Sequence, residues 1–437
     1  MVSGSQKTGV GISICAFIYA LICVSLSAQS LSYGDTNLEE FGLVIIVVTT
    51  IWLLSIWLVN QDAQPSKGWI ISCSVLFQLC LLPAYPVLEN DILRYMWDGY
   101  VFVETGNPYA VLPADFFQRD DVPANMQQVL NLVSYPFTPT VYGPVAESLF
   151  ALSYLILPGS VLPIKFFSFI AVVSLTLLLA KKVSVQQLLL FCWSPLVLFQ
   201  FSLNGHIDIL AVLLVFAALT YSNVGKWWLS PVFLSLAVMT KIVAILALPF
   251  VLILKRQYIT TLIILAVVYV PLLLSGKHEL LGLKAMAEFW MFNSFFYSLW
   301  LIWFDNLWIK IISLIIFMGV YFSVVSSKKF FMTFENRCTG LFIVYSVFLL
   351  GLSVLNAWYL IWILCFALFT NTRWPWVLAC TIWLSLLTGL NLNYPNLGLY
   401  EIPLPVIILE YSAVVIICLL MGYFQRWTIK GKAAFSV

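Results

Sequence analysis

Residues 41–60 read FGLVIIVVTTIWLLSIWLVN, twenty residues without a charged side chain. An α-helix needs about 20 apolar residues to cross the hydrocarbon core of a bilayer. Further apolar runs follow the same pattern, at 9–30, 69–88, 141–157, 162–180, 185–202, 207–222, 228–253, 258–275, 305–326, 339–355, 357–370, 375–390 and 403–424. Because several runs are short, we expect roughly 12 to 14 spans, some of them partial.

The overall composition supports the same class of protein. Apolar residues (AVILMFWYC) make up 62% of the 437 residues and charged residues only 9%, and the mean hydropathy is +1.01. About a quarter of the residues of a soluble protein are charged, so a soluble enzyme is excluded. A net charge of +2 lacks the basic footprint of a nucleic-acid binder, and a transmembrane β-barrel would show short alternating segments. We therefore predict an all-α, polytopic membrane protein with one domain over residues 1–437.

The basic residues indicate the orientation of the chain. They gather in short turns and in the C-terminal tail, namely at Lys67, Lys255, Arg256, Lys328, Lys329, Arg373, Arg426, Lys430 and Lys432. The positive-inside rule places these turns in the cytoplasm, and the polar segments 89–140 and 276–304 on the external face. Strict alternation would leave Lys181, Lys182 and Lys226 outside. That conflict disappears if one segment among 141–180 is re-entrant and 228–253 is a broken hairpin around a cavity.

Three of the 19 acids in the chain lie in the segment ENDILRYMWD, residues 89–98, beside an arginine. If 91–105 is helical, Asp91, Arg94, Tyr95 and Asp98 share one face, and the Gly-Asn-Pro at 106–108 ends the helix. One interpretation is a solvated helix on the membrane surface with an internal ion pair. The other is a carboxylate that takes a proton from an acceptor hydroxyl, with Arg94 orienting it or meeting a phosphate.

Several motifs occur in the order known from one superfamily. The segments ENDILRYMWDG (89–99), GNPY (106–109) and TPTVYGP (138–144) resemble the first external loop of C-type (GT-C) glycosyltransferases, and more narrowly that of bacterial polyprenol-phosphate-mannose-dependent mannosyltransferases. NGHID (204–208), TK (240–241) before LP (248–249), and NAWYLIW (356–362) are similar to their later motifs. The resemblance covers about residues 85–370. It departs from the family pattern at 89–91, where END replaces a simple D-D pair, and at Gly143 and Ala357, which replace prolines.

The resemblance implies an inverting glycosyltransferase of the plasma (inner) membrane. It would move a hexose, expected to be mannose, from a polyprenyl-phosphate donor to a hydroxyl of a glycan or lipid acceptor on the external (periplasmic) face. Asp91 is the expected base and Glu89 its alternative. Arg94, Lys241 and His206 would bind the donor phosphate. The expected substrate-binding residues are Tyr95, Asp98, Asn107, Tyr109, Tyr142, Asn204, Asp208, Asn356, Trp358 and Tyr359.

These residues also have structural interpretations. Lys241 lies in an apolar run and either faces a cavity or extends to the interface. His206 and Asp208 either contact the substrate or begin a capped helix. Tyr142 either lines the site or belongs to a helix-start turn. The aromatic residues of 358–362 either stack on sugars or anchor the helix at the interface.

Two other classes of function remain open. A polysaccharide polymerase or ligase also uses lipid-linked sugars, but typically carries arginines in a late external loop, and 276–304 contains none. We read that aromatic segment as a possible lid. A secondary transporter would show paired halves with interrupted helices, and none are visible.

The expected partners are the lipid-linked donor, a glycan or lipid acceptor and membrane lipid, with no nucleic acid. The sequence requires no cofactor. Two histidines exclude a multi-histidine metal site, and Glu89 with Asp91 neither demands nor excludes a divalent ion.

Overall fold

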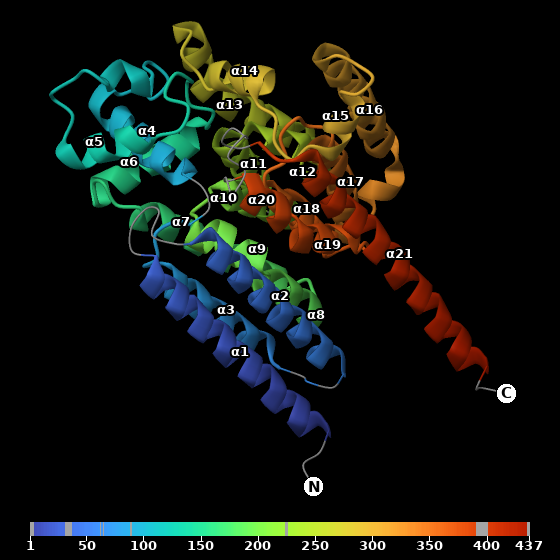
Figure 1. Ribbon diagram of the computed structural model, residues 1–437. Helices are drawn as coiled ribbons and strands as arrows, with labels where there is room; N and C mark the ends of the chain where they lie inside the picture. The colour runs from blue at the N-terminus through green and yellow to red at the C-terminus, as the bar shows by residue number, and fades with distance from the viewer. Residues whose placement is uncertain are drawn as a thin grey trace.

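The computed structural model describes residues 4–30, 37–61, 63, 65–87, 90–222, 226–389 and 401–434 (Figure 1). Every regular element in these ranges is a helix, which confirms the predicted all-α class. An isolated β-bridge joins Phe292 to Val354. The helices before residue 200 are α1 (Gly4–Gln29), α2 (Leu38–Gln61), α3 (Lys67–Leu81), α4 (Asp91–Thr105), α5 (Ala124–Leu132), α6 (Pro144–Ile156), α7 (Leu162–Ala180), α8 (Val185–Cys192) and α9 (Pro195–Val197).

The second half of the described chain is helical as well. A π-helix, η2 (Leu198–Leu203), leads into it. Its elements are α10 (Asp208–Tyr221), α11 (Leu229–Thr240), η3 (Ile242–Ala247), α12 (Leu248–Val251), α13 (Lys255–Ser275), α14 (Leu280–Phe289), α15 (Phe295–Trp300), α16 (Asn306–Ser326), α17 (Phe334–Leu350), η5 (Ala357–Leu360), α18 (Ile361–Ala367), α19 (Trp374–Thr381), α20 (Trp383–Gly389) and α21 (Leu404–Ala434).

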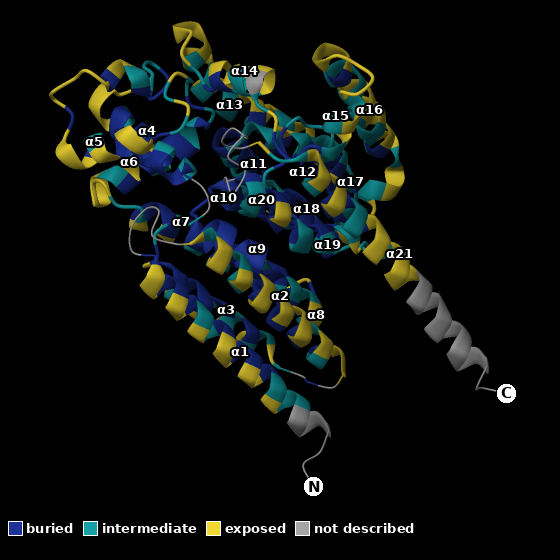
Figure 2. Cartoon of the chain, viewed as in Figure 1, coloured by how far each residue is buried: buried dark blue, intermediate teal, exposed yellow. Residues whose placement is uncertain are grey.

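Six helices in the described part of the chain are long and apolar enough to cross a bilayer. They lie in α1, α2, α7, α13, α16 and α21, and α8 with α9–η2 adds a seventh if this pair, bent by 44°, is one span. The other apolar runs form helices of 10–17 residues, which are the partial spans that the sequence predicts. In Figure 2 the outer faces of α1 and α2 are exposed and their inner faces buried. These exposed apolar faces fit a hydrocarbon solvent.

Two hydrogen bonds bring the basic turns together at one end of the helices. The ammonium of Lys67 donates to the carbonyl of Ala180 at 2.7 Å, which places the turn after α7 beside the start of α3. The guanidinium of Arg337 donates to the hydroxyl of Ser222 at 2.8 Å, which places the end of α10 beside the start of α17. The lysines that strict alternation would leave on the outside therefore lie with the other basic turns.

The segment 228–253 forms the expected broken hairpin. Helix α11 ends at Thr240, and Lys241 is extended, with φ −150° and ψ 119°. The chain then turns back through η3 and α12, which pack against α11. The Gln257 amide donates to the carbonyl of Trp227 at 3.1 Å, so α13 begins beside the start of α11. Lys241 is therefore at the tip of the hairpin.

Helix α6 packs with α4 and α5, the helices of the polar segment 89–140. It packs along α4 (Figure 1), and Gly159, just beyond its end, lies against Asn125 of α5. With 13 residues, α6 is about 20 Å long, too short to span a bilayer of about 30 Å. Thus α4, α5 and α6 form a compact cap at the end of the helices opposite the basic turns.

Candidate active site

The polar face of α4 is turned toward the protein interior. The helix runs from Asp91 to Thr105, as the sequence predicts, and ends at Gly106 with φ +74°. The side chains of Tyr95 and Asp98 are buried, whereas 32% of the Asp91 side chain is exposed. This burial excludes a helix that lies on the membrane surface with its polar face in water. It leaves Asp91 as the accessible acid at the start of α4.

The segment 204–207 places His206 next to the polar face of α4. The π-helix η2 ends just before it, and Gly205 has φ +76°, a conformation that favours glycine. A Cβ at this position would lie 2.8 Å from Cδ1 of Ile92, so a larger residue would also displace the end of that side chain. The side-chain oxygen of Asn204 accepts a hydrogen bond from the amide of Val87 at 3.1 Å. Asn204 therefore fixes the chain just before α4.

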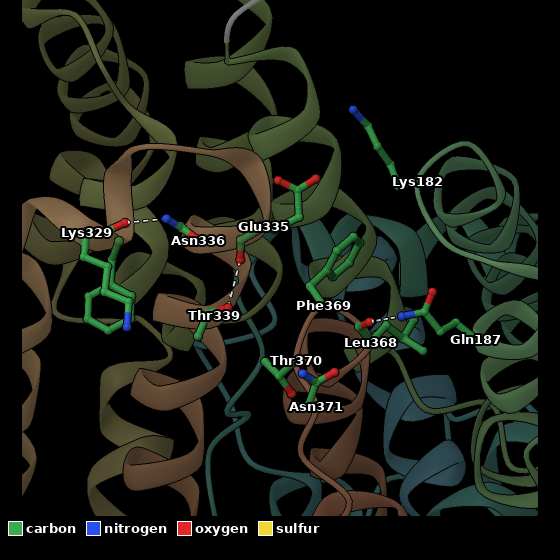
Figure 3. A pocket seen from close by; sticks show the side chains of 11 residues that line it. Lys182, Gln187, Lys329, Glu335, Asn336, Thr339, Leu368, Phe369, Thr370 and Asn371 are labelled. Carbon is green, nitrogen blue, oxygen red and sulfur yellow. Dashed lines mark hydrogen bonds between the residues drawn. The ribbon is translucent and has the colours of Figure 1, made fainter. Parts of the chain in front are cut away.

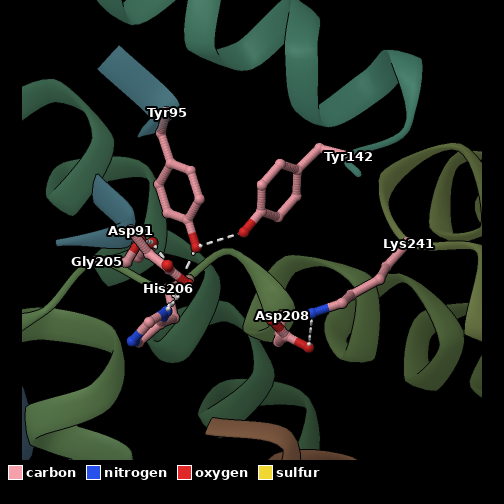
Figure 4. A network of polar contacts seen from close by, with 8 residues as sticks. Asp91, Tyr95, Tyr142, Gly205, His206, Asp208 and Lys241 are labelled. Atoms are coloured by element: carbon pink, nitrogen blue, oxygen red, sulfur yellow. Dashed lines mark hydrogen bonds and ion pairs between the residues drawn. The ribbon is translucent and has the colours of Figure 1, made fainter. Parts of the chain in front are cut away.

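Asp91 is at the open end of a small polar group (Figure 4). The Tyr142 hydroxyl donates to the Tyr95 hydroxyl at 3.2 Å, and the Tyr95 hydroxyl lies 3.4 Å from Nδ1 of His206. The same nitrogen is 4.0 Å from Oδ2 of Asp91. The ring of Trp358 stacks on His206 with a centroid separation of 3.8 Å. Five of the predicted residues, distant in sequence, thus meet in one place.

A second group adjoins the first (Figure 4). The ammonium of Lys241 lies 2.6 Å from both carboxylate oxygens of Asp208, and the indole N–H of Trp362 donates to Oδ1 at 3.0 Å. The Asp208 side chain is 1% exposed and that of Lys241 21% exposed. The ammonium also lies 4.6 Å from the ring centroid of Tyr359. Trp362 is therefore a buried hydrogen-bond donor to Asp208, and neither stacks on a sugar nor anchors the helix at the interface.

The two groups lie within electrostatic reach of each other. Burial raises the pKa of Asp91 to about 6, although Lys241 opposes this rise. The carboxylate of Asp208 raises the pKa further and Arg94 lowers it. Half of the carboxylate population is therefore ionised near pH 6, which suits a general base that works close to neutral pH.

Arg94 is held inside the polar segment 89–140. Its Nε donates to Oδ1 of Asp98 at 2.8 Å, and its Nη1 donates to the carbonyls of Thr138 at 3.0 Å and Tyr135 at 3.4 Å. Burial raises the pKa of Asp98, and Arg94 opposes that rise. Close by, the Thr140 hydroxyl donates to a carboxylate oxygen of Glu147 at 2.6 Å. The contacts of Arg94 join α4 to residues 135–138 and do not reach toward Asp91.

The remaining predicted residues lie outside the two polar groups, and some of them fix the backbone near the site. The side-chain oxygen of Asn107 accepts from the amide of Tyr109 at 2.9 Å, and the Tyr109 hydroxyl donates to the carbonyl of Tyr142 at 2.8 Å. These bonds fix the backbone that carries Tyr142. Asn356 is half-buried and directly precedes η5. Glu89, the alternative base, lies outside the described residues.

Sequence reasoning missed Lys165. This lysine of α7 is fully buried, and its ammonium donates to the carbonyls of Leu81 and Leu82 at 2.9 Å each, and also to that of Ala84. It thereby closes the end of α3, next to Gly205. A lysine inside an apolar run was the signal that singled out Lys241, and the same signal was present here.

The segment 276–304, expected as a lid, is anchored at its centre. Phe292 exchanges backbone hydrogen bonds with residues 353–355, and the Asn293 amide donates to the buried carboxylate of Glu410 at 2.9 Å. The Trp290 ring lies 4.3 Å from that of Tyr135 in the polar segment 89–140. Any lid movement would have to break these contacts. Within the described ranges, no group of three or more His, Cys, Asp or Glu side chains is placed to hold a metal ion.

Comparison with known proteins identifies a family. Residues 13–257 match the family model described as alpha-(1->6)-mannopyranosyltransferase, N-terminal domain. The match spans more than half of the 437 residues and includes Asp91, His206, Asp208 and Lys241. No curated protein and no solved structure matches the chain.

Proposed function

The chain belongs to the alpha-(1->6)-mannopyranosyltransferase family, and from this premise we propose that it transfers mannose from a polyprenyl-phosphate donor to a hydroxyl of a glycan or lipid acceptor. We place the reaction on the external face of the plasma membrane, because the site lies at the end of the helices opposite the basic turns. Asp91 acts as the base.

The accessibility of Asp91 carries this proposal. Asp98 and Asp208 are 3% and 1% exposed, and each already bonds to a cation. Asp91 is 32% exposed and, among the described residues, accepts no hydrogen bond from a cation. A base must reach the hydroxyl that it deprotonates and must be free to take the proton. Of these three aspartates, Asp91 alone meets both conditions.

The reaction that follows is a single displacement. Asp91 takes the proton of the acceptor hydroxyl, and the hydroxyl oxygen forms a bond to the anomeric carbon of mannose. The bond from that carbon to the phosphate oxygen breaks on the opposite side, and its electron pair leaves with the polyprenyl phosphate. The configuration at the anomeric carbon is inverted, so an alpha product requires a beta-linked donor.

Lys241 receives the charge of the leaving phosphate. An ammonium has three N–H donors, and two of them can serve the oxygens of Asp208. The third is available to the phosphate, and the partial exposure of Lys241 leaves room for it. The carboxylate of Asp208 holds the ammonium in this position through both of its oxygens. Asp208 is thus a positioning residue for Lys241.

His206 has an orienting role and Arg94 a structural role. His206 lies 4.0 Å from Asp91 and is fixed by the Trp358 ring, so it orients the base rather than the phosphate. Arg94 maintains the fold of the first external loop through its bonds to Asp98 and to the carbonyls of residues 135 and 138. Lys241 is therefore the residue that binds the donor phosphate.

The experiment is a donor assay with purified protein in lipid nanodiscs. Labelled beta-linked polyprenyl-phosphate mannose should support transfer, and the alpha-linked isomer should not. NMR of the product should show an alpha linkage. Transfer from a lipid-pyrophosphate oligosaccharide instead would overturn the proposal in favour of a polymerase or ligase.

A further inference from the structure

A polar hollow lies at the basic end of the helices, and Figure 3 shows the residues that line it. Its volume is about 460 Å³. It lies between the start of α8, the start of α17 and the residues that follow α18. Its lining includes Lys182, Gln187, Lys329, Glu335, Asn336 and Asn371. Lys182 follows α7 and Lys165 lies near its other end, so about 25 Å of helix separates the hollow from the Asp91 site.

Two lysines provide the charge of this hollow. The ammonium of Lys182 lies 4.6 Å from the ring centroid of Phe334, and that of Lys329 lies 5.9 Å from the ring centroid of Phe330. Neither lysine forms an ion pair within the part of the chain that the structure describes. A ring face attracts a cation without neutralising it. The two lysines are therefore positioned at the hollow with their charges available.

The rest of the lining is polar and partly fixed. The side-chain amide of Gln187 donates to the carbonyl of Leu368 at 2.5 Å, and that of Asn336 donates to the carbonyl of Lys329 at 2.8 Å. The first bond joins α8 to the residues after α18, and the second holds the turn that precedes α17. One carboxylate, that of Glu335, lines it as well, so the two lysines leave a net positive charge.

We propose that this hollow binds the phosphate head group of an anionic phospholipid from the leaflet at the basic end of the protein. Basic pockets between membrane helices at the cytoplasmic side suit such head groups. A lipid is favoured over a soluble anion because the hollow lies where membrane helices end, and because Met332, 76% exposed, follows the lining residues Lys329 and Phe330 in the chain. The head group would meet Lys182 and Lys329, and the acyl chains would follow the apolar helix surfaces.

The test uses full-length protein and a matched pair of double variants. Binding of phosphatidylglycerol is measured by native mass spectrometry with Lys182→Ala/Lys329→Ala and with Lys181→Ala/Lys328→Ala. Both variants remove two exposed lysines, and only the first removes the lysines that line the hollow. The first should bind about 30-fold more weakly than wild type, and the second about as well as wild type. Equal losses in both, or no loss in either, would overturn the site.

Two further measurements identify the source of the phosphate. Phosphatidylcholine, which has no net charge, should bind at least tenfold more weakly than phosphatidylglycerol. Inorganic phosphate at millimolar concentration should leave phosphatidylglycerol bound. Displacement by inorganic phosphate would show a site for a soluble anion and would contradict the lipid proposal. Because neither lysine belongs to the Asp91 site, mannosyl transfer in the first variant serves as the control for correct folding.

Discussion

Asp91 and Asp98 lie two turns apart on α4, and their surroundings are opposite. Asp98 is 3% exposed and bonds to Arg94, which also bonds to two carbonyls of the same loop. Asp91 is 32% exposed, and a histidine nitrogen 4.0 Å away is its nearest basic group. Both carboxyl groups have a raised pKa because of burial. The pKa direction alone therefore does not distinguish them.

The difference in pairing does distinguish the two acids. Asp98 is buried and its Oδ1 bonds to the Arg94 cation, so this acid connects parts of the fold. An acid with unused capacity at an accessible position can bond to a substrate. The same contrast separates Lys241, which bonds to Asp208 and keeps a third donor, from Lys165, whose three donors all meet carbonyls.

The largest expected effect is that of Asp91→Asn on activity. Loss of a general base should lower kcat by about 10²- to 10⁴-fold. The thermal unfolding temperature should not fall, because the amide removes a charge that burial disfavours. Assays of mannosyl transfer and unfolding in detergent measure both effects. Asp121→Asn, in an exposed ion pair of the same loop, is the control and should keep full activity. Wild-type activity in Asp91→Asn would assign the base to Glu89 instead.

Arg94→Met tests the buried ion pair between Arg94 and Asp98 on α4. It leaves the carboxylate of Asp98 buried without its cation, which should lower the free energy of unfolding by about 3–5 kcal/mol. Chemical denaturation in detergent measures the change. Arg119→Met removes an arginine from an exposed pair with Asp121 and should change stability little. If the two variants were equally stable, the bond from Arg94 to Asp98 would be no more than a surface ion pair.

Lys241→Met should weaken use of the donor. Loss of one charged hydrogen bond should reduce kcat/KM for the donor by about 10- to 100-fold. The single variant also leaves Asp208 buried and unpaired, so Lys241→Met/Asp208→Leu is the informative companion. It should regain folding stability and keep the defect in kcat/KM. Recovery of activity in the double variant would make Lys241 structural only.

The pH profile gives the smallest effect and reports directly on Asp91. A base is active when deprotonated, so with a pKa of about 6 the value of kcat/KM should fall about tenfold for each pH unit below 6. It should be flat above that pH. Because Lys241 lowers the pKa of Asp91, Lys241→Met should move the acid limb to higher pH. If the acid limb of Lys241→Met stays at the wild-type pH, Lys241 has no electrostatic effect on Asp91.

Much of the molecule could be predicted from local sequence. The helix 91–105, its end at Gly106, the broken hairpin in 228–253 and the common side of the basic turns follow from spacing, apolar runs and charge. The order of motifs, which resembles that of a known superfamily, also indicated most residues of the site. The pairing of those residues could not be predicted in this way. Arg94 was expected near a phosphate and bonds to a loop more than 40 residues away. Trp362 was expected either on a sugar or at the interface, and bonds to Asp208.

The sequence by itself determined that this protein is a helical membrane protein, because only 40 of its 437 side chains are charged and long apolar runs cannot be covered in water. It also determined where α4 lies, because helix periodicity and a terminating glycine act over a few residues. Only the tertiary structure decided which acid is accessible and which cation is already bonded to a protein group. Burial and ion pairing depend on segments such as 204–208, 241 and 358–362, which meet α4 only when the whole chain is packed.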